Sequence, residues 1–135
     1  MAVQFSTTLR NARLDTIESH IGTSAVLKIR TGAQPANVAA ADSGTVLATL
    51  SLPADYLAAA SGGTKAKSGT WEDLSADATG TAAHWRLYQS DGTTPHAQGS
   101  VTITGGGGDM TVDSTSFTAA QAVTITGWTF TEGNA

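Results

Sequence analysis

The sequence has no cysteine, few charged residues and no long apolar run, and each lack excludes a class of protein. Without cysteine, the 135-residue chain can form neither a disulfide framework nor a thiolate metal site, which suits folding in a reducing cytosol. Seven Lys and Arg against eleven Asp and Glu give a formal net charge of −4. Sequence-independent binding of nucleic acid needs a basic surface that displaces counterions, so we expect no nucleic-acid partner.

The apolar stretches are too short to direct secretion or to cross a bilayer. Residues 1–14, MAVQFSTTLRNARL, lack the uninterrupted apolar segment of a secretory signal. No apolar run approaches the roughly 20 residues that span a membrane. We therefore expect a soluble protein that is made in the cytoplasm and has no membrane partner. Charged residues are only 13% of the chain, and such a surface suits either a plain β domain or a protein covered by neighbours.

Residues 6–21, STTLRNARLDTIESHI, have the pattern of one amphipathic helix, with Ser6 suited to cap its start and Gly22 to end it. The apolar stripe comprises Leu14, Ile17 and Ile21, widened by Leu9 and Ala12, and the opposite face comprises Asn11, Asp15 and Glu18. Arg10 and Arg13 flank the stripe, where their stems can pack while their charged groups reach a partner. The pattern is compatible with a helix lying across a sheet of its own domain and with an arm docking on another subunit.

After Gly22 the sequence changes to short runs rich in Thr, Val, Ile and aromatic residues, which are typical of strands. The expected strands are 25–31, 45–52, 82–90, 96–104, 110–114 and 121–131, with another short one near 65–71. Residues 32–44 predict a surface loop, and the irregular tract 53–80 a helical turn over 55–60. The predicted fold is mainly β: an antiparallel β-sandwich or jelly-roll-like domain over residues 23–135, preceded by an N-terminal arm or helix over residues 1–22.

The segment 102–112, TITGGGGDMTV, is the stretch that suggests a nucleotide site. A phosphate-binding loop of the G-x-x-x-x-G-K-[ST] type needs a lysine after its last glycine, whereas Asp109 follows Gly108 here. A dinucleotide-binding loop opens a helix, but the residues after Asp109 predict a strand. We expect the four glycines to connect two strands and to bind no nucleotide.

No set of residues predicts a catalytic or metal site. His20, His84 and His96 have neither H-x-x-x-H nor H-x-H spacing. The acidic segment 71–77, WEDLSAD, lacks the calcium-loop pattern, and no G-x-S-x-G nucleophile elbow is present. We therefore expect no metal, no cofactor and no enzymatic activity.

The tryptophans leave a choice between a core and a ligand platform. In the strand 82–90, Trp85 shares one face with Leu87 while Arg86 and Tyr88 share the other, which favours a core position for Trp85. The solvent exposure of Trp71 and Trp128 distinguishes a core role from an alternative in which they bind carbohydrate. Exposure of either would favour a glycan platform, and burial of both would count against it.

Four blocks of the sequence resemble small proteins of tailed bacteriophages and prophages. They are residues 5–36, 44–52, 75–102 and 105–135, and their motifs include L-x-I-x-T-G-x-x-P, D-A-T-G-T-A-x-x-W-R-L and D-M-T-V-D followed by V-T-I-T. The resemblance implies a non-enzymatic virion component built on an antiparallel β-sandwich. It implies first a decoration or cement protein on the capsid exterior, and as the alternative a tail, collar or fibre component, including one that binds host glycan.

The same resemblance implies the major capsid protein as partner, together with self-association as a dimer or trimer. A cement protein needs segments that bridge neighbouring subunits, and the amphipathic helix near the N-terminus is the expected arm. The predicted partner-binding residues are Phe5, Leu9, Arg10, Arg13 and Leu14.

Overall fold

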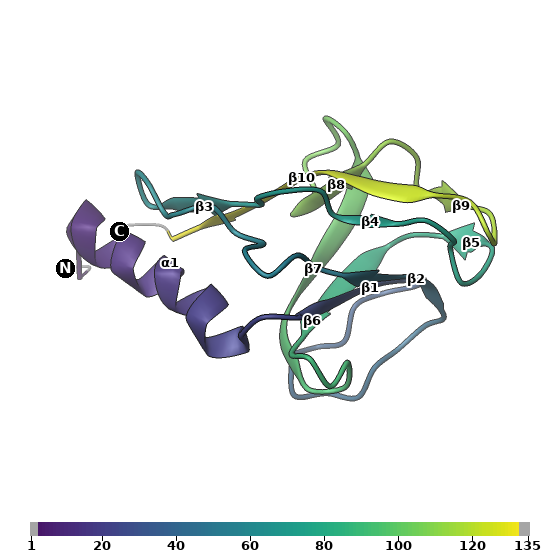
Figure 1. The fold of residues 1–135 in the computed structure, drawn as a ribbon, viewed down its shortest axis with the longest axis horizontal. Coiled ribbons are helices and arrows are strands. Elements are labelled where there is room, and N and C mark those ends of the chain that lie inside the picture. The colour runs from purple at the N-terminus through teal and green to yellow at the C-terminus, as the bar shows by residue number, and fades with distance from the viewer. Residues whose placement is uncertain (1–2, 133–135) are drawn as a thin grey trace.

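The computed structural model describes residues 3–132, which form one helix followed by ten strands (Figure 1). Residues 1–2 and 133–135, the outer ends of the expected units 1–22 and 23–135, lie outside the described residues. In chain order the elements are α1 (Thr7–Ile21), β1 (Val26–Arg30), β2 (Val46–Ser51), β3 (Thr64–Ala66), β4 (Glu72–Asp73), β5 (Gly80–Thr81), β6 (His84–Tyr88), β7 (Pro95–Ile103), β8 (Met110–Val112), β9 (Ser116–Phe117) and β10 (Val123–Thr131).

The predicted fold class, mainly β with one N-terminal helix, is confirmed. Eight strands form one curved sheet in the order β2-β1-β6-β7-β8-β10-β3, with β4 paired to β10, while β5 and β9 form a separate pair. Figure 1 shows two layers, with β1, β2 and β6 in one and β3, β4 and β10 in the other, and β7 running from the first to the second. The layers also meet at their edges, because the Thr49 amide of β2 donates to the Asp73 carboxylate of β4.

The core lies between the two layers and is built around three tryptophans. The ring of Trp128 lies 5.2 Å from that of Trp71 and 5.7 Å from that of Trp85, measured between centroids. All three side chains are buried, and the aliphatic residues of β1 and β2 pack around them. The core position predicted for Trp85 is confirmed. Offset and tilted ring contacts of this kind add to the free energy of burying the aromatic surface.

The helical turn predicted over residues 55–60 is wrong. This segment is extended, and it pairs with the chain that returns through β3: the Ala58 amide donates to the Ala66 carbonyl and the Ser68 amide to the Tyr56 carbonyl. Alanine favours helix in isolation. Here the backbone groups of a short segment are satisfied by pairing with a neighbouring segment, and tertiary context overrides that preference.

The glycine segment 105–108 makes an unusually short connection between parallel strands. β7 pairs parallel to β8, yet only residues 104–109 join them, whereas a parallel pair ordinarily needs a crossover of a dozen or more residues. Gly105 and Gly107 have φ of +84° and +81°, and a Cβ at Gly106 or Gly108 would lie 2.8 Å from side-chain atoms of Thr102. Gly105 and Gly107 therefore supply the positive φ of the connection, Gly106 and Gly108 leave the space beside Thr102 free, and a strand follows them, as predicted.

Candidate functional site

The helix α1 lies at one end of the sandwich and is the element for which the sequence predicts partner binding (Figure 1). Ser6 caps it as expected, since its hydroxyl accepts a hydrogen bond from the Leu9 amide at 3.2 Å. Gly22, at φ +85°, ends it and donates its amide to the Glu18 carbonyl. The boundaries predicted from the sequence are thus confirmed to within one residue.

The polar face of α1, which was expected to lie opposite the packed face of the helix, is itself packed. It binds the segment 56–65 of the same chain. Three helix side chains accept hydrogen bonds from backbone amides that no strand satisfies. The bonds run from Tyr56 N and Leu57 N to Glu18 Oε1 (2.9 and 3.3 Å), from Ala60 N to Asp15 Oδ1 (2.9 Å), and from Gly63 N to Asn11 Oδ1 (2.8 Å). The helix therefore takes the place of a neighbouring strand at this edge.

An ion pair and an apolar contact add to this docking. Lys65 is 3% exposed and places its Nζ 2.7 Å from Asp15 Oδ1. On the apolar stripe, Leu14 and Ile21 are buried, and Ile17 packs against the core. Of the two interpretations of the helix, packing on its own domain is the one that the structure of the single chain shows.

The five predicted partner-binding residues fall into two groups. Leu14 is buried, and both arginines contact Glu132 of the same chain: Arg10 Nη1 donates to its carbonyl at 3.0 Å, and Arg13 Nη1 lies 2.6 Å from its Oε1. Phe5 and Leu9 remain 38% and 45% exposed.

Val3 is a third exposed apolar residue next to this end of the helix. It is 72% exposed, the same as Leu74 and more than Phe5 or Leu9. Val3 was not among the predicted partner-binding residues, because it lies before the helical pattern of residues 6–21. We call Val3, Phe5 and Leu9 together the N-terminal apolar residues.

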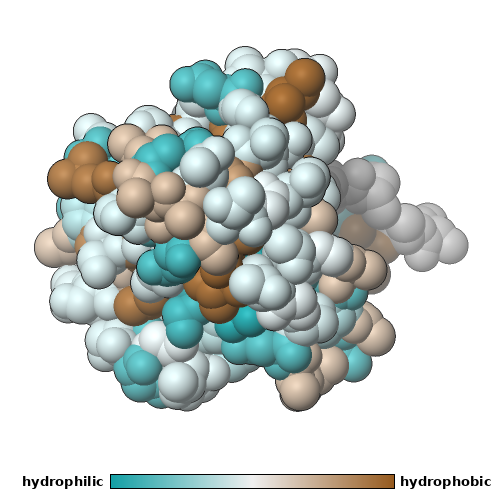
Figure 2. Space-filling view, turned by 90° about the vertical axis from the view of Figure 1, so that its right-hand side faces the viewer, coloured by the Kyte–Doolittle hydropathy of each residue, from teal (hydrophilic) through white to brown (hydrophobic). Residues whose placement is uncertain are grey.

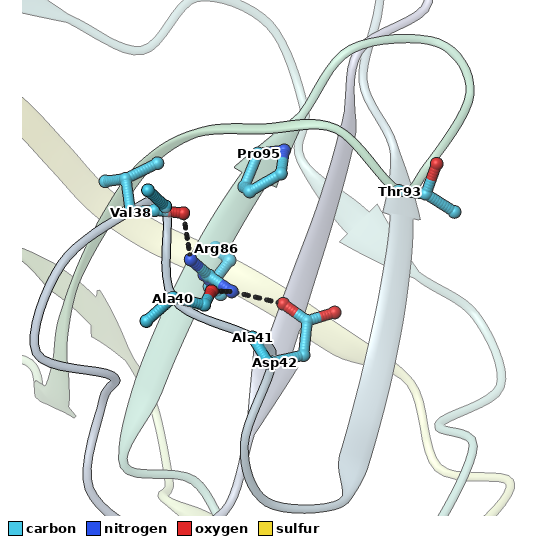
Figure 3. Close-up of a pocket in the computed structure, with 8 residues that line it drawn as sticks. Val38, Ala40, Ala41, Asp42, Arg86, Thr93 and Pro95 are labelled. Atoms are coloured by element: carbon cyan, nitrogen blue, oxygen red, sulfur yellow. Dashed lines mark hydrogen bonds and ion pairs between the residues drawn. The ribbon is translucent and has the colours of Figure 1, made fainter.

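A second candidate site lies on the far face of β6. The sequence placed Arg86 and Tyr88 opposite the core, yet every residue of β6 is buried, because the loop 32–44 covers that face. Figure 3 shows the Arg86 guanidinium held between the loop and the strands. Its Nη2 donates to the Val38 carbonyl at 2.6 Å and its Nη1 to the Ala40 carbonyl at 3.1 Å, and Nη1 also pairs with Asp42.

Asp42 is the only carboxylate in this cluster and serves two arginines. Its Oδ2 lies 2.7 Å from Arg30 Nη2, and its Oδ1 accepts a hydrogen bond of 2.8 Å from the Tyr88 hydroxyl. Burial by itself would raise the pKa of Asp42, but the hydrogen bonds from Tyr88 and Arg86 and the positive charges of the two arginines outweigh it, so the pKa lies below its ordinary value. Asp42 is therefore ionised at neutral pH. We call Arg30, Asp42, Arg86 and Tyr88 the arginine–aspartate cluster.

An open depression of about 530 Å³ adjoins this cluster, lined by residues 38–42, Arg86, Thr93 and Pro95. The charged groups at its base already bind one another and the carbonyls of the loop. This arrangement makes the cluster a clamp that holds the loop 32–44 on β1 and β6.

Two of the three histidines lie together in the fold. The rings of His20 at the end of α1 and His96 near the start of β7 meet edge to face, with centroids 5.1 Å apart and ring planes at 89°. His84 is separate and buried, and its Nδ1 lies 2.8 Å from the Gly32 carbonyl. Within residues 3–132, no group of three or more His, Cys, Asp or Glu is arranged to hold a metal ion. The pair was missed because its members lie on elements far apart in the sequence.

No known protein family, curated protein or solved structure matches this chain. The likeness to phage proteins therefore rests on the sequence motifs alone. Among the described residues, none of the helical structure is long and apolar enough to cross a membrane. Trp71 and Trp128 are 1% and 3% exposed, and burial of both counts against the glycan platform.

Proposed function

We propose that the protein is a non-enzymatic structural component of a tailed-bacteriophage virion and that it decorates the capsid exterior by binding the major capsid protein. The observation that carries this proposal is the set of N-terminal apolar residues, exposed beside a helix that is held to the sandwich along residues 11–21. The anchored part of α1 fixes the position of its first turn. Leu9, which lies in that turn, therefore loses little freedom when a partner covers it, and Val3 and Phe5 lie in the residues that lead into the helix.

The free energy available from these residues indicates how attachment works. Fully burying a Val, Leu or Phe side chain contributes about 1.5–3 kcal/mol. Because Val3, Phe5 and Leu9 are 72%, 38% and 45% exposed, covering all three would contribute about 3 kcal/mol in total. This is too little for tight binding by one copy. Repetition over a symmetric shell and self-association as a dimer or trimer supply the remainder, because linked weak contacts gain avidity.

The opposite end of the molecule is a less suitable attachment surface. Figure 2 looks onto the end away from α1, where apolar residues occur as separate spots among polar ones. If the protein attached through the α1 end, the face shown in Figure 2 would point away from the capsid.

The copy number in virions tests the placement. Quantitative mass spectrometry of virions purified from the phage or induced prophage that encodes the chain should find it at a copy number close to that of the major capsid protein. A copy number far below that, in particles whose isolated tails carry the protein, would overturn the capsid placement in favour of the tail, collar or fibre alternative.

Point variants test the attachment surface. Phe5→Asp and Leu9→Asp should reduce occupancy on capsids, because an unpaired carboxylate would have to enter an apolar contact. Leu74→Asp is the matched control, since Leu74 is 72% exposed in the loop after β4 and should leave occupancy unchanged. Full occupancy of both N-terminal variants would refute attachment through this end.

A further inference from the structure

We propose that His20 and His96 form a binding site for one divalent transition-metal ion, such as Zn²⁺, Ni²⁺ or Cu²⁺, between the end of α1 and β7. The two imidazoles meet edge to face beside an open depression of about 350 Å³ that Thr16, Ile17 and Ile21 also line. His20 is exposed and His96 partly so. An ion therefore reaches the pair directly from solvent.

The distance between the rings fits shared coordination. Imidazole nitrogens bind Zn²⁺ at about 2.0–2.1 Å, and at a tetrahedral angle this places the centroids of two bound rings about 5 Å apart. The observed separation is 5.1 Å. The backbones of α1 and β7 thus already hold the two side chains at the required spacing. His20, which is exposed on the last turn of α1, is the ring that would turn to share an ion with His96.

The hydrogen bonds of His96 leave one ring nitrogen ready to bind a metal. Gln89 Nε2 donates to Asp91 Oδ2 at 3.1 Å, which fixes the orientation of the amide. Gln89 Oε1 then faces His96 Nε2 at 3.1 Å. Because an amide oxygen only accepts, Nε2 carries the hydrogen and Nδ1 keeps its lone pair. A ring N–H that donates to a fixed oxygen is the usual outer-shell support of a metal-binding histidine.

Two histidine ligands favour transition-metal ions over Mg²⁺ and Ca²⁺. Imidazole suits Zn²⁺, Cu²⁺ and Ni²⁺, whereas Mg²⁺ and Ca²⁺ prefer oxygen ligands. Two protein ligands leave the remaining coordination positions to water. The site would therefore bind reversibly, and a bound ion would tie the last turn of α1 to the sandwich. This inference is independent of the proposed role in the virion.

Calorimetric titration of the full, tag-free chain with ZnCl₂ and with NiCl₂ tests the proposal. One ion should bind per chain, and His20→Ala and His96→Ala should each abolish saturable binding. Gln89→Leu should weaken it about 10–100-fold, because it removes the support of His96. Asp113→Ala, which changes an exposed carboxylate, is the matched control and should bind as the wild type does.

Thermal unfolding distinguishes one ion shared by His20 and His96 from separate ions bound by each histidine alone. Zn²⁺ should raise the unfolding midpoint of the wild type and of Asp113→Ala, because a ligand that prefers the folded state stabilises it, and should not raise that of His20→Ala. His20 lies exposed on the helix surface, so this variant keeps the test decisive even where His96→Ala folds poorly. Absence of saturable binding by the wild type, or binding that His20→Ala leaves unchanged or only halves in stoichiometry, would overturn the proposal.

Discussion

Replacement of Asp42 by alanine tests the arginine–aspartate cluster most directly, because it removes the only carboxylate that two buried arginines share. The Arg86 and Arg30 side chains are 1% and 8% exposed, and the substitution leaves both without a counter-charge and leaves the Tyr88 hydroxyl without its acceptor. Breaking a buried ion pair by removing one partner costs about 3–5 kcal/mol. Because the Asp42 side chain is 36% exposed, water screens part of the interaction, and we expect a loss of about 2–4 kcal/mol.

Urea unfolding followed by tryptophan fluorescence measures this loss. Trp85 lies next to Arg86 on β6, so the signal reports on the strand that the clamp covers. For a slope of about 2 kcal/mol per molar urea, the midpoint should fall by about 1–2 M. Asp113→Ala, the surface control, should change the free energy of unfolding by no more than about 0.5 kcal/mol.

The reasoning would be refuted by an Asp42→Ala variant that unfolds at the same urea concentration as the control. A double variant sharpens the test. Adding Arg86→Met to Asp42→Ala removes one of the uncompensated charges and replaces it with an apolar side chain. It should recover part of the stability, since an unpaired buried charge costs more than an apolar residue of similar volume.

Three further changes have defined outcomes. The lowered pKa of Asp42 means that its contribution to stability is present above the ordinary value of 3.8 and is lost as the pH falls through the folded-state pKa; urea midpoints at about pH 5 and pH 3 should therefore differ more for the wild type than for Asp42→Asn. Gly108→Ala should destabilise by about 1–3 kcal/mol, because its Cβ would overlap Thr102, and an unchanged urea midpoint would contradict that crowding. Residues 102–112 should show no saturable ATP binding by calorimetry; binding that Gly106→Ala removes would contradict the assignment of this segment as a strand connection.

Short-range pattern was enough to predict the helix and the longer strands, but not β4, β5 and β9. The cap at Ser6, the glycine at position 22 and the spacing of Leu14, Ile17 and Ile21 predicted α1 almost to the residue. Alternating β-formers predicted the long strands and the core position of Trp85. Helix capping and side-chain periodicity depend on neighbours a few residues away, so a single sequence contains that information.

Tertiary structure alone decided what the polar residues do. Asp15 and Glu18 have the pattern of a solvated helix face, but they bind backbone amides of a segment that the sequence misassigned as a helical turn. Arg86 is buried because a distant loop folds over β6 and brings Asp42 to it, and His20 meets His96 only because α1 ends beside β7. Hydrophobic periodicity predicts which side chains are buried. It does not predict which polar groups meet in the folded protein, because those contacts join segments that are far apart in the chain.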